Sequence, residues 1–248
     1  MISDILDDCP HVKVISDEVY EFLTYDGRQH TPFATVGNNW KRTVSVYSGG
    51  KLMNATGWKI GWSVGPSNLI CDGARVALAV YDSFNTPGQM AMGNSLEQCT
   101  VPNYNEARDS FVQTSAKMLV ENRDSLAQAI TNSEIPWKPV LCQGGYFMMA
   151  DVSECRDVIP EQYLLSHDYE TEDGSPPVKK ARYNMPNGKV PLDLAFCRWM
   201  AIEKSVIMLP VSFFYHENSA TITDQYVRLS ISKDRVSTEN AIERLRNC

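Results

Sequence analysis

The first part of the chain mixes apolar and polar positions in a pattern that predicts one helix and then several strands. Ile2, Ile5 and Leu6 recur at helical spacing, and Pro10 ends the predicted helix because proline cannot continue it. Apolar runs that follow are predicted to be buried strands over residues 12–15, 43–47 and 59–64. A helix followed by buried strands indicates α/β layering, with the sheet covered on both faces.

The pattern beyond these strands predicts longer helices and then a second structural unit. Helices are expected over residues 69–80, from about 89, and over a long amphipathic stretch free of glycine and proline, 105–130. Further strands are expected over residues 140–150, 207–209 and 226–232, and further helices over 192–203 and 238–246. The second part is interpreted as a smaller α+β unit hinged on the long helix. The predicted domains are residues 1–110, a connecting helix over 111–136, and residues 137–248.

Composition and charge narrow the class of protein. The chain has 248 residues, 43% hydrophobic and 21% charged, which is ordinary for a globular protein. A net charge of -7 with dispersed basic residues argues against nucleic acid or an anionic membrane as a partner. Seven scattered cysteines without a CxxC pair indicate reduced thiols, and four isolated histidines predict no metal site. The amino terminus lacks the pattern of a secretory signal.

Asp17 and Tyr20 stand directly after the first predicted strand, in the segment Ser16-Asp17-Glu18-Val19-Tyr20. In open α/β sheets, ligands bind beyond the carboxyl ends of the strands. An aspartate there can face a ligand, and a tyrosine three residues later can reach the same place. These residues alone favour a simpler interpretation, in which the aspartate caps the next turn and the tyrosine packs against it.

Lys51 follows the next predicted strand, in the segment Ser48-Gly49-Gly50-Lys51. Two glycines permit a sharp turn with close backbone approach, and Ser48 offers a hydroxyl and an N–H group suited to phosphate. A lysine held out of water near a cationic neighbour is a nucleophilic amine. A glycine hairpin with a solvated lysine explains these residues equally well when they are taken alone.

Lys59 lies in a third segment, Thr56-Gly57-Trp58-Lys59-Ile60-Gly61-Trp62, and is expected to emerge from an apolar strand. A lysine in such surroundings needs an anionic partner, and a phosphate would serve. Three such segments in this order are harder to explain by chance than any one of them.

Together, the motifs D-x-x-Y, S-x-G-K and TGWKIGW resemble the class I, fold type I pyridoxal-phosphate aminotransferases. Within that class they are most similar to the kynurenine–oxoglutarate transaminases, also known as cysteine-S-conjugate β-lyases. Further similar stretches include Gly144-Gly145-Tyr146-Phe147, Leu209-Pro210-Val211-Ser212 and Tyr226-Val227-Arg228-Leu229-Ser230. The resemblance covers nearly the whole chain except the polar stretch over residues 166–190, which is expected to be a surface loop.

The resemblance implies a role in cofactor binding for five residues. Lys51 would form a Schiff base with pyridoxal 5'-phosphate and then move the substrate's proton. Asp17 would pair with the pyridine nitrogen, and Tyr20 would donate to the phenolic oxygen of the ring. Ser48 and Lys59 would hold the phosphate.

The resemblance also implies the reaction and the partners. Arg228 would bind the substrate α-carboxylate in a bidentate pair; without the resemblance, an arginine in a surface ion pair is the simpler interpretation. The implied activity is transamination of kynurenine or a related aromatic or sulfur amino acid with a 2-oxo acid, with β-lyase side activity. A homodimer is implied for the full-length protein, in the cytoplasm or the mitochondrion. A relative of the aspartate or alanine aminotransferases fits GWKIGW less well.

Members of the group carry a further half before the D-x-x-Y strand. The expected fold is therefore the C-terminal part of the large domain, with an incomplete, mainly parallel sheet, followed by a complete small α+β domain. An unpaired strand edge and uncovered apolar faces are expected in that incomplete sheet. The alternative function is that of a truncated, catalytically impaired fragment that acts only as a dimerising or interaction module.

Overall fold

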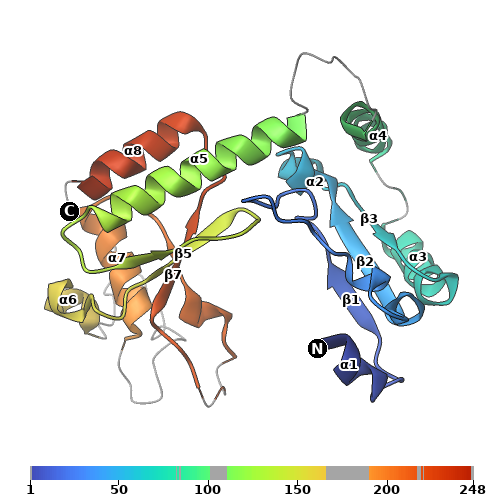
Figure 1. Ribbon diagram of the computed structural model, residues 1–248, viewed down its shortest axis with the longest axis horizontal. Helices are drawn as coiled ribbons and strands as arrows, with labels where there is room; N and C mark the ends of the chain where they lie inside the picture. Colours follow the sequence, from blue (N-terminus) through green and yellow to red (C-terminus); the bar gives the residue numbers. More distant parts are fainter. Residues whose placement is uncertain are drawn as a thin grey trace, which may run out of the picture. The chain divides into compact units, whose positions relative to one another are not determined.

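The computed structural model describes residues 2–81, 83, 85–100, 111–165, 190–216, 219 and 221–246. The chain divides into two compact units, each built on its own sheet (Figure 1). The first unit comprises Met1–Lys117 and Gln143–Gly145, and the second comprises Met118–Cys142 and Tyr146–Cys248. The expected beginning of the long helix near residue 105 and the expected loop over 166–189 lie outside the described residues.

The first unit contains a three-stranded sheet in the order β1-β2-β3. β1 (Val14–Asp17) pairs in parallel with β2 (Thr43–Ser48), whereas β3 (Gly61–Val64) pairs with β2 in antiparallel orientation. The expected parallel orientation is thus confirmed for β1 and β2 and is wrong for β2 and β3. The connection from β2 to β3 holds only a single helical turn, α2 (Gly49–Leu52), and a 3-10 turn, η3 (Thr56–Trp58). Such a connection is too short to return the chain to the opposite end of the sheet.

The helices of the first unit are α1 (Ile2–Asp7), α3 (Ser67–Tyr81) and α4 (Thr86–Thr100), with 3-10 turns η1 (Phe33–Thr35) and η2 (Asn39–Arg42). α4 begins three residues before the predicted position because Asn85 acts as its N-cap. The Oδ1 atom of Asn85 accepts a hydrogen bond from the Gly88 N–H group at 3.0 Å. Pro87 fits in the first turn, where its missing N–H group is not needed.

Much of the apolar surface of the first unit is uncovered. Ile15 on β1 is 79% exposed, and α3 has no buried residue although it carries Val76 and Leu78. Among the described residues, β1 has a strand neighbour on one side only. The expectation of an unpaired edge with uncovered apolar faces is therefore confirmed for this part of the chain, and the expectation of a sheet covered on both faces is wrong for β1.

The second unit contains a four-stranded antiparallel sheet in the order β4-β5-β7-β6. The strands are β4 (Lys138–Val140), β5 (Phe147–Asp151), β7 (Tyr226–Ser230) and β6 (Leu209–Pro210). Its helices are α5 (Phe111–Thr131), which enters this unit at Met118, α6 (Glu161–Leu164), α7 (Leu192–Glu203) and α8 (Arg235–Arg246), with 3-10 turns η4 (Arg156–Val158) and η5 (Val211–Phe214). α8 runs beside α5 (Figure 1). None of the helices in the described ranges combines the length and apolarity that a membrane crossing requires.

α8 begins three residues before the predicted position because an aspartate caps it. The carboxylate of Asp234 accepts hydrogen bonds from the Ser237 hydroxyl at 2.7 Å and the Ser237 N–H group at 2.9 Å. These bonds lower the pKa of Asp234, since they stabilise its charged form. The spacing of Asp234 and Ser237, three positions apart, is the sequence signal that could have identified this helix start.

The core of the second unit lies where α7 packs on the sheet. Phe196 and Met148 are fully buried at 0% exposure, and α7 contacts both β6 and β7. The ring of Phe196 lies 5.2 Å from that of Trp137 and 5.8 Å from that of Trp199, measured between centroids. Aromatic pairs at these separations add to the free energy gained from burying the rings alone.

Cysteine reactivity is expected to differ strongly between the two units. Burial raises the pKa of Cys155 to about 12, because the thiolate has lost its hydration. Cys71, in contrast, is exposed on α3. At pH 8, iodoacetamide should therefore alkylate Cys71 at least about a hundredfold faster than Cys155, since only the thiolate reacts. Timed quenching and peptide mass spectrometry measure both rates; equal rates in the folded protein would contradict the buried position of Cys155.

Candidate functional site

Several polar residues lie where the parallel strands β1 and β2 of the first unit end. The register pairs Asp17 with Val46, so the carboxyl ends of both strands lie at the same end of the sheet. Ser48, the last residue of β2, pairs with Gly61 at the start of β3. Asp17, Ser48 and the segment entering β3 therefore lie at the carboxyl ends of the parallel strands, which is where ligands of open α/β sheets bind.

Lys51 lies in the helical turn α2, directly after β2, and its side chain is half-buried. Gly50 is required by close packing rather than by a left-handed backbone. A Cβ atom there would lie 2.9 Å from the Thr56 Cα atom and 3.0 Å from the Ala55 oxygen, whereas a Cβ atom on Gly49 would meet only the flexible side chain of Met92. The predicted sharp turn is therefore a helical turn, and it fixes the backbone from which Lys51 projects.

Lys59 is exposed and precedes β3, so the expectation that it emerges from the strand is wrong. It follows η3 with a left-handed backbone, φ 57°, which costs a residue other than glycine about 1–2 kcal/mol. The Gly49 N–H group donates to the Ile60 oxygen at 3.2 Å. This bond joins the segment that enters β3 to the turn that carries Lys51.

Asp17 is the last residue of β1, not the first after the strand as predicted, and Tyr20 lies in the turn that follows. Asp17 is exposed, and its Oδ1 atom accepts a hydrogen bond from the Val19 N–H group at 3.4 Å, which is the capping contact that the simpler interpretation predicts. Tyr20 is half-buried beside Gly145, where a Cβ atom would lie 3.2 Å from its ring. Gly145 has φ +76°, a conformation that suits glycine. Asp17 thus caps the turn and still presents its carboxylate to solvent.

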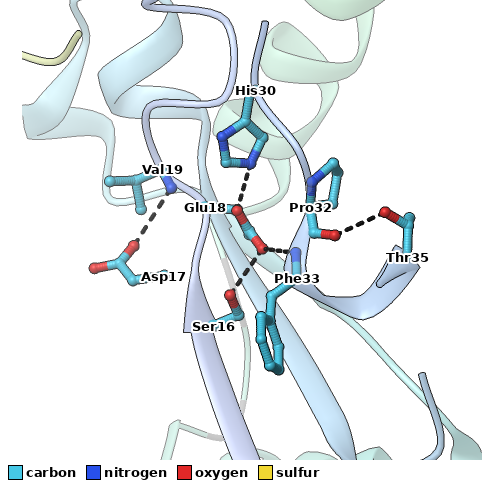
Figure 2. Close-up of polar contacts among 8 residues, drawn as sticks. All are labelled: Ser16, Asp17, Glu18, Val19, His30, Pro32, Phe33 and Thr35. Carbon is cyan, nitrogen blue, oxygen red and sulfur yellow. Dashed lines mark hydrogen bonds and ion pairs between the residues drawn. The ribbon is translucent and has the colours of Figure 1, made fainter. Parts of the chain in front are cut away.

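Glu18, to which no role was assigned from the sequence, anchors this turn from inside (Figure 2). The side chain is 4% exposed, and its Oε1 atom accepts hydrogen bonds from the Ser16 hydroxyl at 2.8 Å and the Phe33 N–H group at 3.0 Å. Its Oε2 atom lies 2.5 Å from the His30 Nε2 atom. Burial acts to raise the pKa of Glu18, but these hydrogen bonds and the charge of His30 together lower it below the ordinary value.

Figure 2 shows that the side chains of Asp17 and Glu18 leave the backbone in different directions. Successive residues of a strand point to opposite faces, so a buried Glu18 leaves Asp17 outside. This alternation was the sequence signal that could have identified Glu18 as the internal anchor. The partner His30 lies twelve positions away and had no signal of its own.

Arg228 lies on β7 in the second unit, where two aromatic rings contact its guanidinium. The Cζ atom lies 4.1 Å from the centroid of the Phe147 ring and 4.8 Å from that of Phe214. The Nε atom is buried, and it has no hydrogen-bond partner within the described ranges. The surface ion pair of the simpler interpretation is not formed with any carboxylate of those ranges. A buried donor without an acceptor is costly, and an incoming anion would remove that cost.

The polar groups at this end of the first unit's sheet suit a phosphate-bearing organic ligand better than a metal ion. The sheet edge offers the amines of Lys51 and Lys59, the hydroxyl of Ser48 and the carboxylate of Asp17. No group of three or more histidine, cysteine, aspartate or glutamate side chains suited to a metal occurs in the part of the chain that was searched, the described residues.

Comparison with known proteins gives a consistent result along the chain. Residues 2–245 match the family model of aminotransferase class I and II. Kynurenine–oxoglutarate transaminase of Dictyostelium discoideum is 33% identical over 236 residues, which cover 95% of this chain and 48% of the relative. Human kynurenine–oxoglutarate transaminase 3 is 32% identical over 236 residues, which cover 93% of this chain and 44% of the relative.

A solved structure shares the fold as well. N-succinyldiaminopimelate aminotransferase from Mycobacterium tuberculosis superposes with a TM-score of 0.71 at 26% identity, over 99% of this chain and 52% of that one. The chain thus spans about half the length of the relatives it matches. Because the family model covers nearly every residue, the chain belongs to the class I and II aminotransferase family.

Proposed function

We propose that this chain supplies the cofactor-binding lysine of an aminotransferase that moves an amino group from kynurenine, or a related aromatic or sulfur amino acid, to a 2-oxo acid. The observation that carries the proposal is that the backbones of Asp17, Ser48 and the Lys51 turn all lie at the carboxyl ends of β1 and β2. Membership of the family supports the reaction class, and the kynurenine transaminases among the relatives support the substrate class.

The residues of the first unit fit pyridoxal 5'-phosphate by their chemistry. The cofactor has an aldehyde, a phosphate and a pyridine nitrogen, and when bound it supplies an electron sink for the substrate. Lys51 is the amine for the aldehyde and the base that moves the substrate's proton. Ser48 and Lys59 are donors for the phosphate, and Asp17 is the carboxylate for the nitrogen. Tyr20, in the turn that Glu18 anchors, is the donor for the phenolic oxygen.

Arg228 is the residue proposed to bind the substrate α-carboxylate. Its support is the buried Nε atom without a partner among the described residues, together with the rings of Phe147 and Phe214 that lie against the guanidinium. A carboxylate would accept two parallel hydrogen bonds from a guanidinium and so be held in one orientation. β-Elimination from cysteine conjugates is proposed as a side activity, since it requires the same proton removal by Lys51.

The proposal is tested by locating where the cofactor attaches. The purified chain is incubated with pyridoxal 5'-phosphate, treated with borohydride to fix any carbonyl–amine adduct, and digested for peptide mass spectrometry. The adduct is expected on Lys51 in clear excess over other lysines, because its turn lies between Ser48, the proposed donor for the phosphate, and the segment of Lys59, at the strand ends that also carry Asp17. The Lys51→Ala variant should lose the lysine-specific adduct.

Lys41 provides the matched control, since it is exposed and lies just before β2. The Lys41→Ala variant should keep the Lys51 adduct in full. Labelling spread evenly over the exposed lysines, or unchanged in total by Lys51→Ala, would contradict the proposal.

A second candidate function is an interaction module without catalysis, which the open edge of β1 and the exposed Ile15 favour. The same experiment separates the two candidates. An interaction module has no need of a lysine that the cofactor labels selectively.

A further inference from the structure

The second unit contains a buried carboxylate that is out of contact with solvent. Asp193, in the first turn of α7, is 0% exposed. Its Oδ2 atom accepts a hydrogen bond from the Ser212 N–H group at 2.7 Å, and its Oδ1 atom accepts one from the Ser212 hydroxyl at 2.9 Å. Oδ1 also accepts one from the Leu194 N–H group at 2.8 Å. Both oxygens therefore hold the 3-10 turn η5 through a single residue, Ser212.

The turn held in this way carries one of the rings on Arg228. η5 ends at Phe214, two residues after Ser212, and the Tyr215 N–H group closes the turn by donating to the Ser212 oxygen at 3.2 Å. β6, which leads into η5, pairs Leu209 directly with Arg228. The chain thus passes beside Arg228 on β6 and returns over it with Phe214.

Phe214 cannot hold its own position by burial. Its side chain is 61% exposed, although its ring centroid lies 4.8 Å from the Arg228 Cζ atom. A largely exposed ring has alternative rotamers that leave the guanidinium uncovered, so its place depends on the backbone of η5. Phe147, on the neighbouring strand β5, is held by the sheet and needs no such support.

The carboxylate that fixes η5 is costly to keep. Burial raises the pKa of Asp193, although the hydrogen bonds of Ser212 and Leu194 oppose this effect. An apolar residue of similar size would fill the same space without that cost. A costly buried carboxylate aimed at a short turn is better explained by the position that it gives the turn than by stability.

We propose that Asp193 is a positioning residue for carboxylate recognition: through Ser212 it fixes η5 so that Phe214 stays stacked on the Arg228 guanidinium. The two rings shield the guanidinium from water, and its unpaired Nε donor is kept for an anion. The ligand is the α-carboxylate of an amino acid or a 2-oxo acid. This inference rests on the proposed role of Arg228 and adds the residues that hold it ready.

The experiment records the Nε–H signal of Arg228 by nitrogen–proton NMR in the full chain, assigned by its loss in Arg228→Lys. Ring currents from Phe147 and Phe214 should displace this signal. Titration with phenylpyruvate gives the affinity for a carboxylate, and the methyl ester of phenylpyruvate is the uncharged control. Asp193→Asn should move the signal toward its position in Phe214→Leu and weaken phenylpyruvate binding about tenfold.

Two further variants keep the inference open to contradiction. Ser212→Ala retains the bond from the Ser212 N–H group and should give a smaller change in the same direction, so it decides the matter if Asp193→Asn does not fold. Asp224→Asn is the matched control. The Asp224 side chain accepts from the Leu192 N–H group at 2.9 Å and its backbone oxygen accepts from the Asp193 N–H group at 3.0 Å, so it contacts the same start of α7, but its side chain has no bond to η5. This variant should leave both readouts within about twofold of the wild type.

The outcomes separate this inference from the proposed role of Arg228. An unchanged Nε–H signal in Asp193→Asn and Ser212→Ala, or an equal change in Asp224→Asn, would overturn the role of Asp193 whatever the ligand does. Phenylpyruvate binding that survives Arg228→Lys would instead overturn the role of Arg228. In that case, the Nε–H signal of the proteins that retain Arg228, recorded without ligand, still reports whether Asp193 places Phe214.

Discussion

Replacing Phe196 by alanine is expected to lower the free energy of unfolding of the second unit by about 3–5 kcal/mol. The side chain is fully buried at 0% exposure between α7 and the sheet, and it contacts the rings of Trp137 and Trp199. Its removal loses the transfer free energy of a phenyl group and leaves a cavity that rigid neighbours cannot fill. Native-state hydrogen exchange in urea, followed in the peptides of α7 and of the second unit's sheet, measures the change.

Ile202 on the same helix provides the control, because it is 62% exposed. Ile202→Ala should change the free energy of unfolding by less than about 0.5 kcal/mol, as an exposed helix position loses little burial and gains helix propensity. Similar losses for both variants would show that α7 does not pack on the sheet through Phe196.

Replacing Glu18 by alanine is expected to destabilise the first unit by about 2–4 kcal/mol. The change leaves the Ser16 hydroxyl, the Phe33 N–H group and the His30 ring without the acceptor that they share. Unpartnered polar groups in a buried position account for most of this loss. Native-state hydrogen exchange in urea, followed in the peptides of β1 to β3, reports the first unit.

The pH dependence of this loss has a definite sign. The folded-state pKa of Glu18 lies below its ordinary value of 4.5, so the folded state binds the proton less readily than the unfolded state. The stability from the carboxylate is then fully present above pH 4.5 and is lost as the pH falls through the folded-state pKa. The difference between wild type and Glu18→Gln should therefore shrink as the pH falls. Asp8→Asn, at an exposed acid of the same unit, is the control and should change the free energy of unfolding by less than about 0.5 kcal/mol.

The helices were easier to predict than the strands, and the reasons are local. α7 has the bounds that the sequence predicted, since most of its residues are apolar and it is buried on most sides. β1 begins two residues later than predicted, because its pairing of Val14 with Thr43 decides where it starts. Apolar character also failed to predict burial at Ile15, whose exposure depends on what covers the sheet.

The site could be predicted only where its residues stand close together in the sequence. Lys51 and Lys59 lie in two short neighbouring motifs, and the order of these motifs along the chain marked both lysines as candidates. Glu18 and His30 are separated by twelve positions, and Asp193 and Ser212 by nineteen. Folding brings such pairs together, and nothing in the local pattern of an apolar helix marks Asp193 as the support of a distant turn.

The left-handed backbone of Lys59 has a consequence for engineering this protein. Glycine adopts that conformation without the steric cost that any side chain carries, so Lys59→Gly would raise the melting temperature if nothing else changed. The same substitution would delete the ammonium group that the proposed phosphate contact uses. A library ranked by heat resistance alone would therefore enrich variants that lack the proposed phosphate contact, so this position should be selected for thermostability and for pyridoxal 5'-phosphate binding together.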